Sequence, residues 1–145
     1  MNKPFEAYRI FNGTHTAVWI DSTRHYEAYG VSAKVTLNTE SIQMCGAFME
    51  DTKTISGKGE GAIELYKTDS SNIGIAFDPE NPDKRHEIVF KVDDPAAIGA
   101  ERIRLIGVHF TETTLAAYQA ASIGRVTLPF TFADYKLLES VAPTI

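Results

Sequence analysis

The chain of 145 residues is 43% hydrophobic and 23% charged, with a formal net charge of -5. This length and composition predict one globular domain, residues 1–145, that buries about 70% of its unfolded surface without disulfides or metals. The acidic balance argues against a classical nucleic-acid binder, and no apolar run is long enough to cross a membrane.

The N-terminal stretch MNKPFEAYRIF lacks the continuous apolar segment of a secretory signal, so we expect the chain to stay in the cytoplasm until it is assembled. Asn12-Gly13 then predicts a type I′ hairpin turn, because both central residues of that turn need a positive φ. Apolar and polar residues alternate in VSAKVTLN, residues 31–38, which predicts a half-buried strand. The only cysteine, Cys45, is expected to be a small buried or half-buried residue rather than a catalytic thiol.

Helical signal is confined to two places. A short helix is predicted after Ser70, because apolar residues then recur at helical spacing until Pro79 ends the pattern. The segment TTLAAYQAAS, residues 113–122, is a second and weaker candidate. The loop FDPENPDKRH between the first helix and the next strand is polar and is expected at the surface.

Alternation predicts the remaining strands and, with them, the fold class. Gly107 lies where the alternation slips, which indicates a bulge, and Pro129 cannot donate to a strand ladder, which indicates an edge or a bulge. The chain is therefore predicted to be mainly β, an antiparallel β-sandwich or barrel with one or two short α-helices. The predicted strands are residues 14–20, 31–38, 62–68, 87–93, 102–110 and 125–132.

The stretch ISGKGEGAIELYKT, residues 55–68, surrounds a lysine with glycines and so raises the question of phosphate binding. A P-loop needs a glycine where Thr52 stands and a Ser or Thr where Gly59 stands. The dinucleotide fingerprint also fails, because these glycines precede a strand rather than a helix. We therefore predict no nucleotide or other cofactor.

The residue types that carry chemistry in enzymes form no recognisable group. The histidines lie in separate segments without metal-ligand spacing, and only one thiol is available. Neither a nucleophile with its base nor a pair of carboxylates occurs in a recognisable context. We predict no catalytic residue, no metal site and no enzymatic activity. The four histidines are His15, His25, His86 and His109.

The aromatic residues leave one alternative open, a carbohydrate-binding or other ligand-binding β-sandwich. Trp19 and the tyrosines at 26, 29 and 66 are candidates for stacking platforms under a sugar ring. The same residues are favoured as core or interface aromatics, and periodicity does not separate the two interpretations.

Three segments follow one another in a recognisable order: FMEDTKTISGKGEGAIELYKTDS, ERIRLIGVHFTET and VTLPFTFADYKLLES. Together they resemble the tail tube proteins of contractile phage tails, in particular those of PBSX-like defective prophages and R-type bacteriocins. Tyr135 stands where that family usually has Phe, and STRHYEAYG has no counterpart in it. The residues that match are Met49, Lys53, Gly57 to Gly61, Tyr66, Lys67, Arg104, Leu105, Phe110 and Pro129 to Tyr135.

The resemblance implies a β-sandwich or barrel subunit that forms hexameric rings, whose sheets join into a continuous inner barrel. Stacked rings would make a hollow tube around the tape-measure protein, inside the contractile sheath, in contact with baseplate or initiator proteins. DNA would pass through without specific binding, and no membrane is involved. The implied location is the virion tail, with synthesis in the cytoplasm of the bacterial host. The nearest alternative is the tube protein of a type VI secretion system.

Within this resemblance, Met49 to Gly61 is expected to be a long connection between two strands, with glycines that allow tight turns. In the family such a loop reaches the neighbouring ring, which predicts subunit contacts along it. The predicted contact residues are Met49, Lys53, Ile55, Gly57, Lys58, Gly59 and Gly61.

Overall fold

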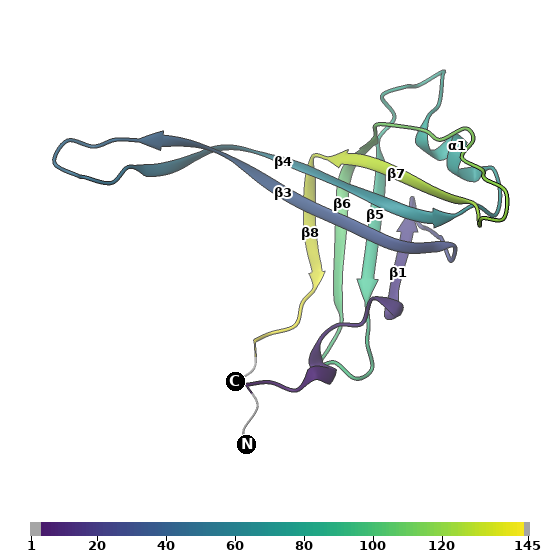
Figure 1. The fold of residues 1–145 in the computed structure, drawn as a ribbon, viewed down its shortest axis with the longest axis horizontal. Coiled ribbons are helices and arrows are strands. Elements are labelled where there is room, and N and C mark those ends of the chain that lie inside the picture. Colours follow the sequence, from purple (N-terminus) through teal and green to yellow (C-terminus); the bar gives the residue numbers. More distant parts are fainter. Residues whose placement is uncertain (1–3, 144–145) are drawn as a thin grey trace.

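The computed structural model describes residues 4–143, and strands make up most of its regular structure (Figure 1). This confirms the predicted mainly β class with few short helices. The strands are β1 (Thr16–Ile20), β2 (Thr23–Arg24), β3 (Ala28–Ile42), β4 (Asp51–Tyr66), β5 (His86–Val92), β6 (Glu101–Phe110), β7 (Arg125–Phe132) and β8 (Asp134–Glu139). The helical elements are α1 (Ser71–Ala76) and the single 3-10 turns η1 (Ala7–Arg9) and η2 (Gly13–His15).

The strands form two antiparallel sheets that share β6. Sheet A contains β2, β1, β5, β6 and β8, and sheet B contains the end of β6 with β7, β4 and β3. The change of partner follows Gly107, where φ is 67° and the register between β5 and β6 shifts. This confirms the bulge predicted at Gly107, since an extra residue bends a strand and lets its end join another sheet.

The core lies between the two sheets, whose strands cross at a steep angle (Figure 1). β1, β4 and β7 contribute alternate residues to it, as the alternation predicts, and β5, β6 and α1 complete it. The opposite residues of each strand point away from the core. The buried core residues are Val18, Ile20, Ile63, Leu65, Ala76, Ile88, Leu105, Val108, Phe110, Val126, Leu128 and Phe130.

The structure also explains how a proline fits into β7. The carbonyl group of Pro129 accepts a hydrogen bond from the Thr111 N–H at 3.1 Å, on the side of β7 that faces β6. β6 pairs with β7 only at His109 and Phe110, so strand pairing on this side of β7 ends next to Pro129. The missing N–H of Pro129 therefore costs no ladder bond, as expected for a proline at an edge.

Of the two predicted helices, α1 is confirmed and residues 113–122 contain none. Leu115 is 69% exposed and Tyr118 is 66% exposed, so no apolar face of this segment packs on the body. Short helices are marginal in water without such packing.

The hairpin turn predicted at Asn12-Gly13 is wrong. The Asn12 side chain accepts a hydrogen bond from the Thr14 N–H at 3.0 Å and so caps η2. The backbone N–H of Asn12 donates to the Asp94 carboxylate at 3.1 Å. Local side-chain bonds of this kind compete with a hairpin turn for the same backbone groups.

Candidate assembly surface

The hairpin of β3 and β4 extends well beyond the sandwich (Figure 1). β7 pairs with β4 only between Gly59 and Tyr66, so residues 51–58 of β4 pair with β3 alone. We call residues 34–58 the arm, with residues 43–50 as its tip. The eight residues of β3 from Val35 to Ile42 carry the arm about 25 Å away from the body.

Every residue of the arm is exposed, including large apolar side chains. At the tip, Phe48 is 100% exposed and Met49 is 78% exposed. A two-stranded ribbon without packing is marginally stable in water, and its unpaired edges can pair with another chain. The arm therefore has the properties of a segment that is completed by a partner. Its other exposed large apolar residues are Val35, Leu37, Ile42, Met44 and Ile55.

The predicted connection from Met49 to Gly61 is wrong over most of its length, because β4 already begins at Asp51. Only Met49 lies in the tip, at its end, and the other six predicted contact residues lie in the strand. The three glycines alternate with Lys58 and Glu60 at a period of two, which is a strand period. Glycine is disfavoured in strands and has no side chain to alternate, so these positions do not show the strand pattern in the sequence.

Two of the glycines make room for aromatic rings of β7. A Cβ atom added at Gly59 would lie 2.5 Å from the ring of Phe132, which is its cross-strand partner. One added at Gly61 would lie 2.8 Å from the ring of Phe130 and would also collide with the Ser32 carbonyl oxygen. These glycines let the rings lie on the strand, and the rings fill the space that the missing side chains leave.

Gly57 has no such ring, because β7 ends at Phe132. An added Cβ there would make only ordinary contacts, 3.6 Å from Val35 and 3.7 Å from Leu37. Ile55 is 61% exposed and is the extra residue of a bulge, since Asn38 pairs with Ser56 and Thr39 with Thr54. On the arm, the core-side face of sheet B thus continues as an apolar surface that no part of the described chain covers.

The lysines of the arm face carboxylates rather than one another. Lys34 and Lys58 lie 3.7 Å and 3.8 Å from Glu60, and Lys53 pairs with Glu40 across the ribbon. These pairs are exposed and contribute little to stability. Since the lysines do not converge and the glycines lie in a strand, the structure offers no phosphate cradle here.

Cys45 lies in the tip and is exposed, so the expectation of a buried or half-buried cysteine is wrong. The tip is shaped by Gly46, whose φ is 86°, and by a hydrogen bond of 2.8 Å from the Gln43 side-chain amide to the Ala47 carbonyl group. The sequence places Cys45 among apolar residues, but these residues have no core to enter. Their exposure is a property of the arm as a whole.

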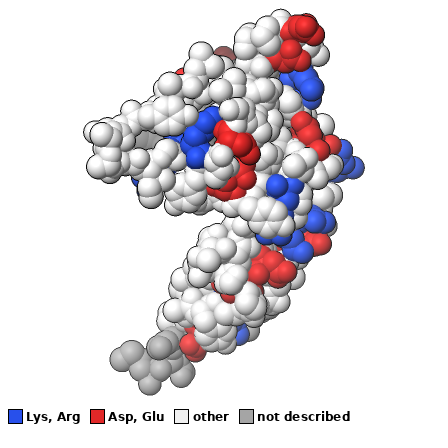
Figure 2. Space-filling view, turned by 90° about the vertical axis from the view of Figure 1, so that its right-hand side faces the viewer, with Lys and Arg blue, Asp and Glu red and all other residues white. Residues whose placement is uncertain are grey.

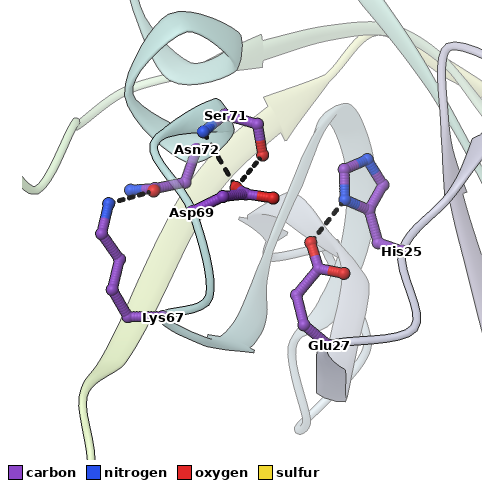
Figure 3. A network of polar contacts seen from close by, with 6 residues as sticks. All are labelled: His25, Glu27, Lys67, Asp69, Ser71 and Asn72. Atoms are coloured by element: carbon purple, nitrogen blue, oxygen red, sulfur yellow. Dashed lines mark hydrogen bonds and ion pairs between the residues drawn. The ribbon is translucent and has the colours of Figure 1, made fainter.

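Two groups of polar contacts, one just before β3 and one between the end of β4 and α1, have a structural role (Figure 3). His25 Nδ1 lies 2.8 Å from Glu27 Oε1. Lys67 donates to Asn72 Oδ1 at 2.6 Å, which ties the end of β4 to the helix. These are local side-chain bonds of the kind that hold a turn, although the Asn72 side-chain nitrogen is buried without a partner in the described part of the chain.

Asp69 lies in the turn before α1, one residue ahead of the N-cap Ser70. Hydrogen bonds from the hydroxyl group and then the backbone N–H of Ser71 lower the pKa of Asp69 below its usual value of 3.8. Over the described residues, no group of three or more His, Cys, Asp and Glu side chains could hold a metal ion. None of the helices there is long and apolar enough to cross a membrane.

Comparison with protein families identifies the family of this chain. The phage tail tube protein family matches residues 3–139, which is nearly the whole chain. The chain belongs to this family. No curated protein sequence is significantly similar to it. The resemblance read from the three ordered segments is thereby confirmed.

Solved structures show how widely this tail tube fold is shared. The cap of the anti-feeding prophage has a TM-score of 0.66 and 9% identity, over 97% of this chain and 94% of that chain. A PVC extracellular contractile injection system, solved as a sheath-tube complex, has a TM-score of 0.65 and 12% identity over 94% and 93%. Hcp1 from Flavobacterium johnsoniae has a TM-score of 0.54 and 15% identity over 85% and 94%. At these identities the likeness is one of fold.

The aromatic residues of this tail tube protein are engaged with one another and with arginines. The ring centroids of Tyr29 and Tyr66 are 4.5 Å apart, and the Arg125 guanidinium lies about 6 Å from both. Trp19 has the guanidinium of Arg24 at 5.7 Å from its ring centroid. This favours the interpretation as structural or interface aromatics over that of sugar-stacking platforms.

Proposed function

We propose that this protein is the structural subunit of the inner tube of a contractile phage-type tail, in which hexameric rings stack into a hollow conduit. The observation that carries the proposal is the arm, a long exposed ribbon that the rest of the described chain does not cover. If the arm of one copy binds a different surface of the next copy, the same contact can repeat from copy to copy in a head-to-tail series. Contacts of that type build open stacks rather than closed pairs.

The predicted contact residues have distinct places in this proposal. Met49 at the tip reaches farthest from the body, and Lys53 and Lys58 lie along the ribbon. Gly57 lies beside Val35 and Leu37 on the uncovered apolar surface of the arm, and Ile55 is an exposed apolar residue of the neighbouring bulge. A neighbouring subunit would cover this surface. It would pack on the arm in the way that sheet A packs on the rest of sheet B. Gly59 and Gly61 instead hold the base of the arm, through the rings of β7.

We further propose that the outer face of sheet B lines the conduit. This face carries small polar residues together with charged ones, and its exposed Lys34 and Lys58 lie 3.7 Å and 3.8 Å from Glu60. A surface with no strong field of uncompensated cations lets a polyanion such as DNA pass without holding it. Residues on this face include Ser32, Lys34, Thr36, Asn38, Glu60, Glu64, Thr127 and Thr131.

The proposal places the sheath outside the tube, the tape-measure protein inside it and baseplate or initiator proteins at its end. The role is structural and not enzymatic. Family membership and the likeness to a chain of a sheath-tube complex support this arrangement. The likeness to Hcp1 is compatible with the alternative of a type VI secretion tube. Genes for a sheath and a tape-measure protein beside this one would favour the phage-type machine.

Electron microscopy of the protein at high concentration tests the proposal directly. Rings or tubes of uniform bore are expected. A strictly monomeric protein, together with the absence of tubes from any particle preparation of the source strain, would overturn it.

A pair of matched variants tests the arm within that experiment. Ile55→Asp replaces an exposed apolar side chain of the arm with a charge, so it should block tube formation while leaving the subunit folded. Ile123→Asp is the control, because Ile123 is 68% exposed but lies outside the arm. Both variants should unfold at the temperature of the unmodified protein. Normal tubes from Ile55→Asp would contradict the assignment of the arm.

A further inference from the structure

The outer face of sheet A carries basic side chains that lie opposite one another. Lys91 pairs with Arg102 and Arg104 pairs with Lys136 in the strand register. Like charges in directly opposite positions destabilise a sheet. Such pairs are unexpected in a chain with a net charge of -5. Arg24 of β2 belongs to the same face, opposite Trp19 of β1.

Nearby carboxylates neutralise only part of this face. Glu87 lies 2.7 Å from Arg104 Nε, and Glu139 lies 3.8 Å from the Lys91 ammonium. Arg24 and Arg102, in contrast, have no carboxylate within 4.0 Å among residues 4–143. On the side of the molecule shown in Figure 2, acidic and basic side chains are otherwise interspersed.

The two unpaired arginines converge on one tryptophan. The guanidinium of Arg24 lies 5.7 Å from the ring centroid of Trp19, and that of Arg102 lies 5.5 Å from it. Arg24 also lies 4.3 Å from the ring centroid of Tyr26, which is 79% exposed. The Nε atom of Arg102 is buried and has no hydrogen-bond partner in the described part of the chain. We call these four residues the Trp19 cluster.

The chemistry of the Trp19 cluster suits a carboxylate. Contact with an aromatic ring holds a guanidinium group in place and leaves its N–H edge free for a planar anion. Arg and carboxylate groups form strong paired hydrogen bonds when they meet in this way. Trp, Tyr and Arg are also the residues that most often dominate the energy of protein interfaces.

We propose that the Trp19 cluster binds an acidic segment of the protein layer that surrounds the tube, which is the sheath. The inference rests on the proposed function, because a conduit lined by sheet B puts the outer face of sheet A on the outside of the tube. DNA is the less suitable ligand, since it would pass along the opposite face. Neither arginine of the cluster has a carboxylate within 4.0 Å in the described part of the chain, so we infer that its partner supplies carboxylates.

Trp19 is the only tryptophan, so its fluorescence reports on this surface alone. The test is a titration of assembled tubes with a short oligo-glutamate peptide. We expect a saturable change in Trp19 emission that weakens as salt is added. The double variant Arg24→Gln and Arg102→Gln should bind the peptide about tenfold more weakly or worse, because it loses two charged donors. The single variant Arg24→Gln, on an exposed edge strand, serves if the double variant fails to fold.

The matched control removes the same charge from the surface loop before β5, with Lys84→Gln and Arg85→Gln. It should bind the peptide like the unmodified protein. No response of Trp19, or an equal response in the Arg24 and Arg102 variant, would overturn the proposal. A stronger response to single-stranded DNA of equal charge would assign the cluster to nucleic acid and also overturn it.

Tube formation, seen by electron microscopy of the same samples, separates this inference from the proposed function. Tubes should form from the Arg24 and Arg102 variant as from its control. Loss of tubes from that variant alone would assign the cluster to contacts between copies and overturn the sheath assignment. Loss of tubes from the unmodified protein would instead contradict the proposed function, and the titration of the free subunit would still decide whether the cluster binds carboxylates.

Discussion

Alanine substitution of Gly57, Gly59 and Gly61 adds the same methyl group at three steps along one face of β4. At Gly61 the new Cβ atom would collide with the Ser32 carbonyl oxygen and lie 2.8 Å from the Phe130 ring. The carbonyl group belongs to the adjacent strand, so it cannot move away without disturbing the pairing of β3 and β4. We expect a loss of about 3 kcal/mol in the free energy of unfolding, at the upper end for overpacked sites.

The effect should shrink and then change sign toward the arm. At Gly59 the collision is with the ring of Phe132, a half-buried side chain that can turn aside, so the expected loss is about 1 kcal/mol. At Gly57 the closest atom would be 3.6 Å away, which is ordinary contact. Replacing a strand glycine by alanine without a clash should gain about 0.5 kcal/mol, because less backbone entropy is lost on folding.

Thermal unfolding of the isolated subunit, followed by circular dichroism, measures this series. For a chain of this length, 1 kcal/mol corresponds to a change of about 4 °C in Tm. The expected order of Tm is Gly57→Ala highest, then Gly59→Ala, then Gly61→Ala. Equal shifts in all three variants, or the largest loss at Gly57, would refute the account of how β7 packs on the glycines.

Two further predictions concern the cap of α1 and the tip of the arm. The pKa of Asp69 is lowered in the fold, so its stabilising effect is present above the ordinary value of 3.8 and is lost as the pH falls through the folded pKa. Asp69→Asn should therefore lower Tm slightly at neutral pH and leave it unchanged in strong acid; an equal loss at both pH values would contradict this reasoning. Cys45, exposed in the tip, should react readily with a maleimide in the free subunit and be protected in assembled tubes, as measured by mass spectrometry. Equal rates in both states would show that the tip stays open to solvent.

The strands of the sandwich were predictable because their inward residues are apolar and their outward residues are polar. Val126, Leu128 and Phe130 are all buried, at the positions that alternation assigns to the core. The short helix after Ser70 was equally visible, since Pro79 and the spacing of apolar residues mark its length. Residues 113–122 show the limit of such spacing, because a helical pattern without a surface to pack on did not form a helix.

Six of the seven predicted contact residues lie in a strand rather than in the expected loop, and their contacts with other subunits stay a prediction. Glycine has no side chain to alternate, so the sequence from Gly57 through Gly59 to Gly61 was interpreted as a flexible loop, although its period of two is that of a strand. The rings that fill two of these positions, Phe132 and Phe130, come from a strand far along the sequence. The residues near the glycines in the sequence therefore do not predict the contacts with those rings.

Local pattern was thus sufficient for the β class, for most strands and for the family resemblance, because each depends on residues that are close together in the sequence. Strand pairing between distant segments settled where β7 stops along β4, and therefore which part of the hairpin becomes the arm. The Trp19 cluster has the same origin, since Arg24, Trp19 and Arg102 meet only after β2, β1 and β6 join one sheet. Contacts of this kind depend on register across the sheet, and register is a property of the folded chain.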